Sequence, residues 1–255
     1  MQPAGATAPA YSHAKRGARK EASSRDDSSS GFAALGLKKD GSLVAVVTMT
    51  GSCCPITRAH SLAFESSRDL LLRPRAASER YTEVLGLLSL NGDRHVGEKL
   101  RSKGQEPIPL VQRGELVRLA AQDLPWMDLN PGREHSVAEE LQTAFPRLRF
   151  HRFAMNGADD VYKYQKWRSC GPERRMITMG RPGFTAKVLE HAQREKVLDQ
   201  GYFLMGPELP DISSTAVRLA LKENDGAALE TLLHPKVAAW LLRSGIYGSS
   251  TASAG

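Results

Sequence analysis

The strongest constraint on the fold is an uninterrupted apolar run in residues 43–49, which read LVAVVTM. A run that is apolar on both faces predicts a central strand of a parallel sheet, covered by helices on both sides. A turn of small residues follows at 50–56, and helical spacing of apolar residues begins at Thr57. The ordered part of the chain is therefore expected to begin with a strand, a tight turn and a helix.

The remainder of the chain repeats this alternation. Short strands alternating with helices of about 10–15 residues indicate an α/β fold, here a Rossmann-like, mostly parallel sheet with helices on both faces and a small C-terminal helical segment. Ligands of such sheets bind beyond the carboxyl ends of the strands, where the strand order reverses. The expected strands are 43–49, 81–90, 126–129, 149–155, 175–179 and 202–205, and the expected helices are 57–71, 110–124, 137–145, 159–167, 186–197, 213–222 and two short ones around 234–235, with a polar loop at 94–109.

The two ends of the chain are expected to lie outside this domain. Ala, Ser and Gly make up half of residues 1–42, and such a segment buries too little apolar area to offset its ordering entropy. We therefore predict a disordered, low-complexity tail at 1–42, a single domain at 43–248 and a disordered end at 249–255.

The net charge of +7 is compatible with a surface for polyanions or a pocket for small anions. The predicted tail accounts for +3 of it, which leaves +4 for the other 213 residues. Aromatic residues make up 6% of the chain and form no stripe with Lys and Arg, so we expect no nucleic acid partner.

The cysteines and the apolar segments indicate the compartment. Three cysteines (Cys53, Cys54 and Cys170) cannot build a disulfide framework, which favours a reducing compartment. The longest uncharged stretch, 41–57, contains Gly and Pro and is too short to span a bilayer, and no secretory signal is visible. We expect a cytoplasmic protein without a membrane partner, and a weak basic cluster at 15–20 leaves the nucleus open.

The first candidate site is the turn after the first strand. Its small residues let backbone N–H groups approach an anion at a helix N-terminus, although the turn is neither a Walker A loop nor GxGxxG. Thr57 and His60 are three residues apart and share one face of the first helical turn. From spacing alone, His60 could instead be an ordinary packing histidine.

The second candidate site is the segment 211–218, which reads DISSTAVR. Ser213 or Ser214 can cap a helix whose free N–H groups hold a phosphate chain, and Arg218 one turn later can neutralise it. The alternative is an ordinary capped helix with an exposed arginine.

Taken together and in this order, GSxxPITxxH and ISSTxxR resemble the eukaryotic-type nicotinamide/nicotinic acid mononucleotide adenylyltransferases, of the nucleotidyltransferase superfamily with an (H/T)xxH signature. The resemblance spans about Leu43 to Tyr247 and implies that 43–248 is a nucleotidyltransferase domain. Further landmarks that fit are SLNGD at 89–93, the segment beginning at Trp126, GAD at 157–159, Trp167, RPG at 181–183 and the closing helix at 233–247.

The resemblance implies transfer of the adenylyl group of ATP to nicotinamide mononucleotide, and to the nicotinic acid nucleotide as well, giving NAD and pyrophosphate in NAD biosynthesis. The attacking phosphate oxygen is already anionic, so the reaction needs alignment and charge neutralisation rather than a general base. The competing interpretations are another enzyme of the superfamily, such as a phosphopantetheine adenylyltransferase, and a basic nucleic-acid-binding module.

The resemblance also implies residue roles, with His60 and Arg218 as the catalytic residues. Mg²⁺ would accompany ATP, with Asp159 near it through water, and a homo-oligomer is the family's habit. The residues implied for ATP are Gly51, Ser52, Thr57, His60, Gly157, Asp159, Ser213, Ser214, Thr215 and Arg218, and those for the mononucleotide are Gly51, Ser52, Trp126, Leu129, Trp167 and Arg181.

The chain departs from the family in several places, among them a longer loop at 94–109 and a shorter segment between Trp167 and Arg174. Cys53 and Cys54 stand where the family has Phe-Asn, and they are either reactive thiols beside a phosphate site or small buried residues. Pro210 replaces an asparagine, which removes a polar contact. Either Arg101 or Lys103 takes the place of the family's phosphate-binding lysine.

Overall fold

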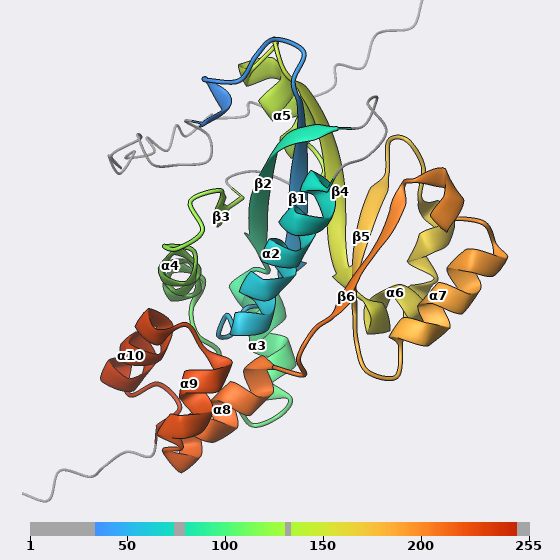
Figure 1. Cartoon of the computed structure of the whole chain (residues 1–255). Helices are drawn as coiled ribbons and strands as arrows, with labels where there is room; N and C mark the ends of the chain where they lie inside the picture. Colours follow the sequence, from blue (N-terminus) through green and yellow to red (C-terminus); the bar gives the residue numbers. More distant parts are fainter. Residues whose placement is uncertain (1–33, 74–79, 131–133, 249–255) are drawn as a thin grey trace, which may run out of the picture.

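The computed structural model describes residues 34–73, 80–130 and 134–248 (Figure 1). Most of the predicted N-terminal tail, residues 1–33, and the predicted C-terminal end, 249–255, lie outside the described residues. Within the described ranges, no helix combines the length and the apolar character that a bilayer-spanning helix requires.

A six-stranded sheet forms the centre of the molecule, in the order β3-β2-β1-β4-β5-β6, and each pairing is parallel. The predicted α/β, Rossmann-like fold is therefore confirmed. The order reverses between β1 and β4, which are neighbours in the sheet but far apart in the chain. The strands are β1 (Leu43–Gly51), β2 (Tyr81–Leu90), β3 (Met127–Leu129), β4 (Arg149–Gly157), β5 (Arg175–Gly180) and β6 (Phe203–Glu208).

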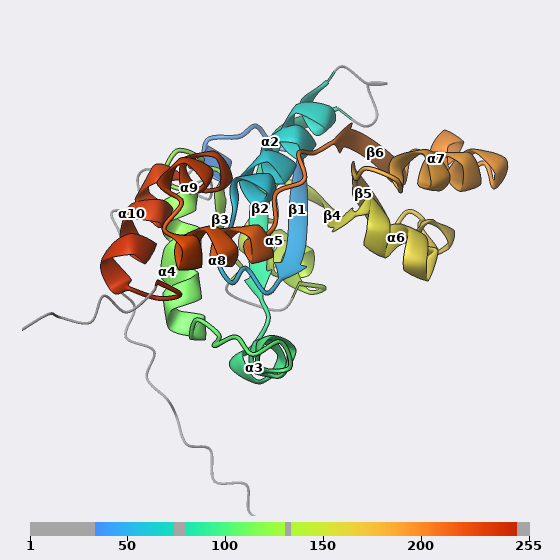
Figure 2. The same ribbon diagram turned by 90° about the horizontal axis from the view of Figure 1, so that it is seen from below.

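Helices cover both faces of the sheet, as the apolar character of β1 predicts. Ala45 and Val47 pack into the larger core under the helices α2, α4, α8, α9 and α10, whereas Val44 and Val46 pack into a second cluster under α5. Figure 2 shows α8–α10 grouped at one end of the sheet and α6 and α7 at the other. The helices are α2 (Arg58–Leu72), α3 (Asp93–Arg101), α4 (Leu110–Ala120), α5 (Val137–Ala144), α6 (Ala158–Tyr164), α7 (Thr185–Arg194), α8 (Ser214–Glu223), α9 (Gly226–Leu232) and α10 (Pro235–Ser244).

Helix α3 occupies part of the segment 94–109 that we expected to be a loop. Its sequence, DRHVGEKLR, is mostly charged, and only Val96, Gly97 and Leu100 are buried. These residues lie on one side of the helix and pack against the larger core. The expectation of a loop was wrong because so many charged residues give the segment the average polarity of a loop, although its few apolar residues share one face of the helix.

The packed part of the chain begins before the predicted boundary at Leu43. Leu35 is only 1% exposed and belongs to the cluster that contains Val44 and Val46. Lys38 forms an ion pair with Glu83 at 2.8 Å, which attaches the same segment to the beginning of β2. Residues 34–42 therefore pack on the domain.

Candidate active site

Three adjoining pockets lie at the carboxyl edge of the sheet, beside the β1/β4 crossover where this class of fold binds ligands. The inner pocket encloses about 150 Å³ between β1, α2, β5 and the segment before α8, the outer groove about 670 Å³ over β1, β4 and α6, and the anion pocket about 180 Å³ between α3 and α8. Five residues line both the inner pocket and the outer groove: Met49, Met155, Asn156, Gly157 and Arg181.

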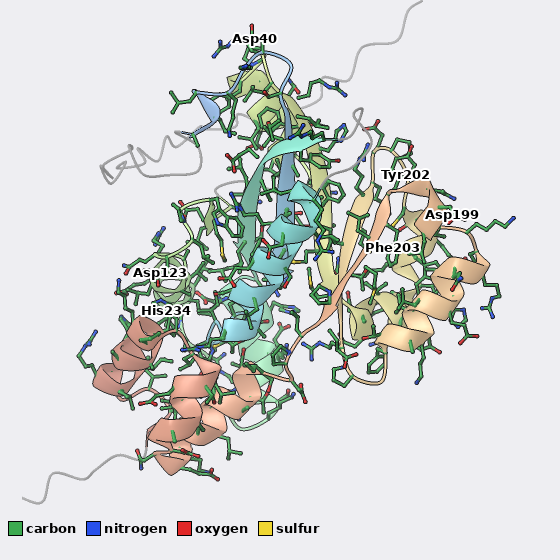
Figure 3. The ribbon with its side chains drawn as sticks, viewed as in Figure 1. Asp40, Asp123, Asp199, Tyr202, Phe203 and His234 are labelled. Atoms are coloured by element: carbon green, nitrogen blue, oxygen red, sulfur yellow. The ribbon has the colours of Figure 1, made fainter. Side chains whose placement is uncertain are left out.

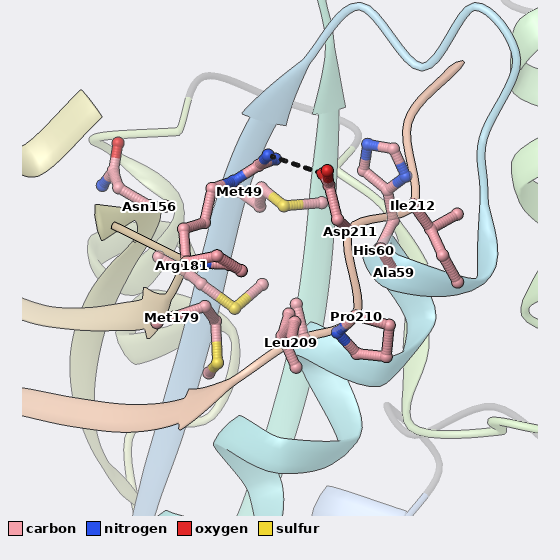
Figure 4. A pocket seen from close by; sticks show the side chains of 15 residues that line it. Met49, Ala59, His60, Asn156, Met179, Arg181, Leu209, Pro210, Asp211 and Ile212 are labelled. Carbon is pink, nitrogen blue, oxygen red and sulfur yellow. Dashed lines mark ion pairs between the residues drawn. The ribbon is translucent and has the colours of Figure 1, made fainter. Parts of the chain in front are cut away.

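His60 lines the inner pocket from the first turn of α2 (Figure 4). Thr57, the N-cap residue, donates its backbone N–H to Nδ1 of His60 at 3.1 Å, and its hydroxyl lies 2.8 Å from the same atom. Because Nδ1 accepts the backbone N–H, the proton of the neutral ring is assigned to Nε2. Thr57 itself is 2% exposed, so it acts on the site through His60.

Electrostatics keep His60 neutral. Burial lowers the pKa of His60 to about 4, and the positive charge of Arg181 acts in the same direction. The imidazole is still partly exposed toward the pocket. At neutral pH it can therefore donate one hydrogen bond from Nε2 to an anion without carrying a charge.

Arg181 lies between the inner pocket and the outer groove and lines both of them. Its guanidinium pairs with Asp159 at 3.2 Å and with Asp211 at 3.9 Å, as Figure 4 shows for the second pair. A side chain at Gly157 would come within 2.6 Å of the Asp159 carboxylate and 3.3 Å of Arg181 Nε. Glycine at the end of β4 thus allows this ion pair to lie against the backbone.

The start of α8 forms one wall of the anion pocket. Ser213 caps the helix, with its hydroxyl accepting the N–H of Ala216 at 3.2 Å, and the hydroxyl of Ser214 donates to the carbonyl of Pro55 at 2.7 Å. The last contact joins α8 to the turn before α2. The two predicted helix starts therefore meet, although they are far apart in the chain.

Arg218 is 6% exposed, which excludes the exposed arginine of the alternative interpretation. It donates to the carbonyl of Cys54 at 2.7 Å, to Thr215 Oγ1 at 3.0 Å and to Gln105 Oε1 at 2.9 Å. A guanidinium has five N–H donors, so two are left without a partner in the described parts of the chain and can serve a ligand of the anion pocket, which Arg218 lines.

Helix α3 and the residues after it supply the opposite wall. Lys99 and Lys103 line the anion pocket, whereas Arg101 pairs with Glu106 at 3.7 Å. Of the two residues left open by the sequence, the structure brings Lys103 to the pocket. Lys99 lies in the same predicted loop as these two residues and was not singled out from the sequence. Among the described residues, the lining contains three cations and no acid: Ser52, Cys54, Lys99, Leu100, Lys103, Ser213, Ser214, Thr215 and Arg218.

The turn after β1 lies between the start of α2 and the start of α8. The Gly51 carbonyl accepts the N–H of Asn91 at 2.9 Å, and Ser52 lines the anion pocket. Cys53 and Cys54 are each 2% exposed, and burial raises the pKa of Cys53 to about 12. Because both cysteines are buried, we interpret them as small packing residues rather than as reactive thiols beside a phosphate site.

Solved structures provide a comparison for this arrangement. Two structures of Plasmodium falciparum nicotinic acid mononucleotide adenylyltransferase, one complexed with APC and one with NaAD, align over 80% of this chain and over 96% and 97% of their own. Their TM-scores are 0.53 and 0.52, at 14% sequence identity. This chain has the fold of that adenylyltransferase. No protein-family model and no curated protein matches the sequence.

On this adenylyltransferase fold, Trp126 does not reach the three pockets. Its carbonyl accepts the N–H of Gly86, in the middle of β2, at 2.9 Å. Arg68 lies over the indole ring, 5.4 Å from its centroid, on the side of the sheet covered by α2. Trp126 is thus partly buried against the larger core, away from the carboxyl edge.

Trp167 is also kept from the pockets by burial. It is 1% exposed and stacks on His191, with ring centroids 5.6 Å apart. Leu129, the last residue of β3, lines none of the three pockets either. Within the described part of the chain, no Trp, Tyr or Phe lines the three pockets. The apolar wall of the inner pocket combines aliphatic residues, such as Leu209 and Ile212, with three methionines: Met49, Met155 and Met179.

The outer groove is strongly polar, and its charges are mostly paired. Arg152 donates to Glu134 at 3.4 Å, and Lys166 pairs with Asp160. Glu134 also accepts from the hydroxyl of Thr48 at 3.0 Å, which brings the segment after β3 across to β1. Such a groove is suited to a ligand with hydroxyl groups and a phosphate rather than to an apolar chain.

Proposed function

We propose that the protein transfers the adenylyl group of ATP to nicotinamide mononucleotide, and to the nicotinic acid nucleotide, forming the dinucleotide and pyrophosphate. One observation carries the proposal. The starts of α2 and α8 meet at the carboxyl ends of β1 and β4, with the donor His60 on one helix and the cationic anion pocket on the other. The fold shared with the nicotinic acid mononucleotide adenylyltransferase supports the same reaction class.

The three pockets correspond to three parts of the reactants. The inner pocket, with its methionine wall, takes the adenosine of ATP, because thioethers pack well against flat rings. The anion pocket takes the β- and γ-phosphates, and the outer groove takes the mononucleotide. The α-phosphate then lies where His60 and Arg181 face it, between the two nucleotides.

The chemistry requires little from the protein beyond alignment and charge neutralisation. An oxygen of the acceptor phosphate forms the new bond to the α-phosphorus, and the bond to the bridging oxygen breaks, so that pyrophosphate leaves with the electron pair. The acceptor phosphate is ionised at neutral pH, and no proton must be removed from it. His60 donates from Nε2 to the transferring phosphate, and Arg218 and the lysines of the anion pocket neutralise the leaving group.

Mg²⁺ fits this site as a companion of ATP. Among the described residues, no group of three or more His, Cys, Asp and Glu side chains could hold a metal, which suits an ion that keeps waters and phosphate oxygens as ligands. When bound, it supplies charge neutralisation between the β- and γ-phosphates. We assign Asp159 as the carboxylate that would contact the water ligands of Mg²⁺. The same carboxylate forms the ion pair with Arg181, so the two interactions would compete for it.

The experiment is a direct assay with a choice of acceptors. The full chain is incubated with ATP and Mg²⁺ and with nicotinamide mononucleotide, nicotinic acid mononucleotide or phosphopantetheine, and both dinucleotide and pyrophosphate are measured. We expect equal amounts of the two products with a pyridine mononucleotide. Because no tryptophan reaches the described pockets, stacking no longer argues against phosphopantetheine. Product with that acceptor alone would replace the proposal with the other reaction of the superfamily. The homo-oligomer and the cytoplasmic or nuclear location remain predictions from the sequence.

A further inference from the structure

A buried arginine outside the pockets connects the segments that form the anion pocket. Arg113 belongs to α4 and is 0% exposed. It lines none of the three pockets described above, and the sequence analysis did not single it out. A fully buried arginine is rare unless its charge and its N–H groups are satisfied.

Four N–H groups of Arg113 are used by three separate stretches of backbone and one carboxylate. Nη1 donates to the carbonyls of Ser52 at 2.9 Å and Asn91 at 2.8 Å, and Nε donates to that of Ile108 at 2.9 Å. Nη2 donates to Asp93 Oδ1 at 3.0 Å, and the same oxygen accepts the N–H of Leu110 at 2.7 Å.

The segments that carry these acceptors must hold fixed positions relative to one another for the anion pocket to form. Ser52 lies in the pocket lining, and Asp93 is the first residue of α3, which carries Lys99. Ile108 in turn donates its N–H to Cys54 Sγ at 3.2 Å, and the Cys54 carbonyl accepts from Arg218. The Arg113 guanidinium thus hydrogen-bonds to three segments at once: the turn after β1, the start of α3 and the start of α4.

The charge of Arg113 adds to this geometric role. Among the described residues its one anionic partner is Asp93, whose side chain is 59% exposed, so water screens the carboxylate while the guanidinium stays buried. The charge also acts on the turn itself, since it opposes the effect of burial on the pKa of Cys53. The buried positive charge therefore lies beneath the turn that would face phosphates.

We propose that Arg113 is a positioning residue for the polyphosphate of the donor: it fixes the turn at Ser52 against α3, so that the anion pocket is formed before the ligand arrives. The proposal rests on the proposed function for the identity of the donor. The proposal predicts a preformed site for a diphosphate, and binding of a diphosphate to this site can be measured without turnover. Preformation matters because a site that must be ordered on binding loses affinity.

The experiment compares Arg113→Met and Arg113→Lys with Arg118→Met, an exposed arginine on the same helix. Binding of inorganic pyrophosphate with Mg²⁺ is measured by calorimetry, and KM values are measured for ATP and for the mononucleotide. We expect pyrophosphate binding to weaken by about tenfold or more in Arg113→Met and by less in Arg113→Lys. The KM of ATP should follow this loss, whereas the KM of the mononucleotide and all values of Arg118→Met should stay within about twofold of wild type.

Equal losses for pyrophosphate and the mononucleotide, or unchanged pyrophosphate binding, would overturn the positioning role. If Arg113→Met does not fold, Arg113→Lys decides by the same criteria, because it keeps a buried cation with fewer and differently directed donors. Failure of the proposed function gives a different result, because the wild type then forms no dinucleotide. The comparison of pyrophosphate binding between the wild type and the Arg113 variants still tests the positioning role.

Discussion

At the scale of single residues, the hydrogen bond between Thr57 and His60 has the clearest functional consequence. It assigns Nδ1 as the acceptor and leaves Nε2–H free to face the inner pocket. The sequence could place both residues on one helical face, because three-residue spacing does so in any helix. It could not show that burial holds the ring neutral, since burial depends on the packed structure.

Replacement of His60 tests its role as a donor. We expect His60→Ala to lower turnover by about 100-fold to 1,000-fold, as loss of one preorganised donor does in other enzymes. The stability should fall by only about 1 kcal/mol, because the substitution removes the contact to the N-cap of α2. Steady-state kinetics and thermal unfolding together check this. A large loss of stability with turnover retained would instead identify a packing histidine.

The protonation of His60 provides a second prediction. With a pKa near 4, the folded protein keeps His60 neutral while the unfolded chain takes up a proton below pH 6.5. The sign follows directly: as the pH falls from 6.5 toward 4, His60 makes folding progressively less favourable. In a ¹H–¹³C NMR titration of the free protein, assigned with His60→Gln, the ring signal should not move above about pH 5. A midpoint near 6.5 would contradict the assigned burial and tautomer.

At the scale of elements, the strands could be predicted and one helix could not. The first six residues of β1 are buried and mostly β-branched, and the Gly and Pro that follow limit the run to the length of a strand, so its sequence favours a strand over a helix. α3 buries little more than Val96 and Leu100, and its polar majority looks like a loop. The direction in which Trp126 and Trp167 point is set by tertiary packing, which motif order does not report.

α3 and the turn that follows it carry the sharpest prediction at this scale. Lys103→Ala and Lys99→Ala should each raise the KM of ATP by about fivefold to thirtyfold, because each removes a charged contact worth roughly 1–2 kcal/mol from the anion pocket. Arg101→Ala is the matched control, since Arg101 pairs with Glu106 and does not line the pocket. Initial rates at varied ATP check this, and a larger effect of Arg101→Ala than of either lysine would contradict the assignment.

At the scale of the whole molecule, the domain boundary differs from the sequence prediction. Composition alone made residues 1–42 look uniform, because one buried leucine among Ala, Ser and Gly does not change the average. Leu35 nevertheless belongs to the core on the α5 side of the sheet. The boundary could therefore be found only from the packed structure.

A pair of leucines tests this boundary. Leu35→Ala should lower the free energy of unfolding by about 2–4 kcal/mol, because it leaves a cavity at a site that is 1% exposed. Leu37→Ala should change it by less than about 0.5 kcal/mol, since that side chain is 89% exposed. Urea unfolding of both variants provides the measurement, and equal small effects would place residues 34–42 outside the cooperative unit.

The interface of α10 with the rest of the molecule lies away from the proposed reaction. Asp123, after the end of α4, and His234, at the start of α10, pair at 2.9 Å. Figure 3 labels both residues. Both His234 nitrogens are used, since Nδ1 accepts the N–H of Lys236. This pair connects the C-terminal helices to the domain and leaves no free nitrogen for catalysis.

The most direct test of the central claim is a crystal structure of the full chain with the dinucleotide product and pyrophosphate. The account predicts adenosine in the inner pocket, the pyridine nucleotide in the outer groove, the bridging phosphates beside His60 and Arg181, and pyrophosphate between Lys103 and Arg218. A dinucleotide bound away from the β1/β4 crossover, or pyrophosphate outside the pocket between α3 and α8, would contradict it.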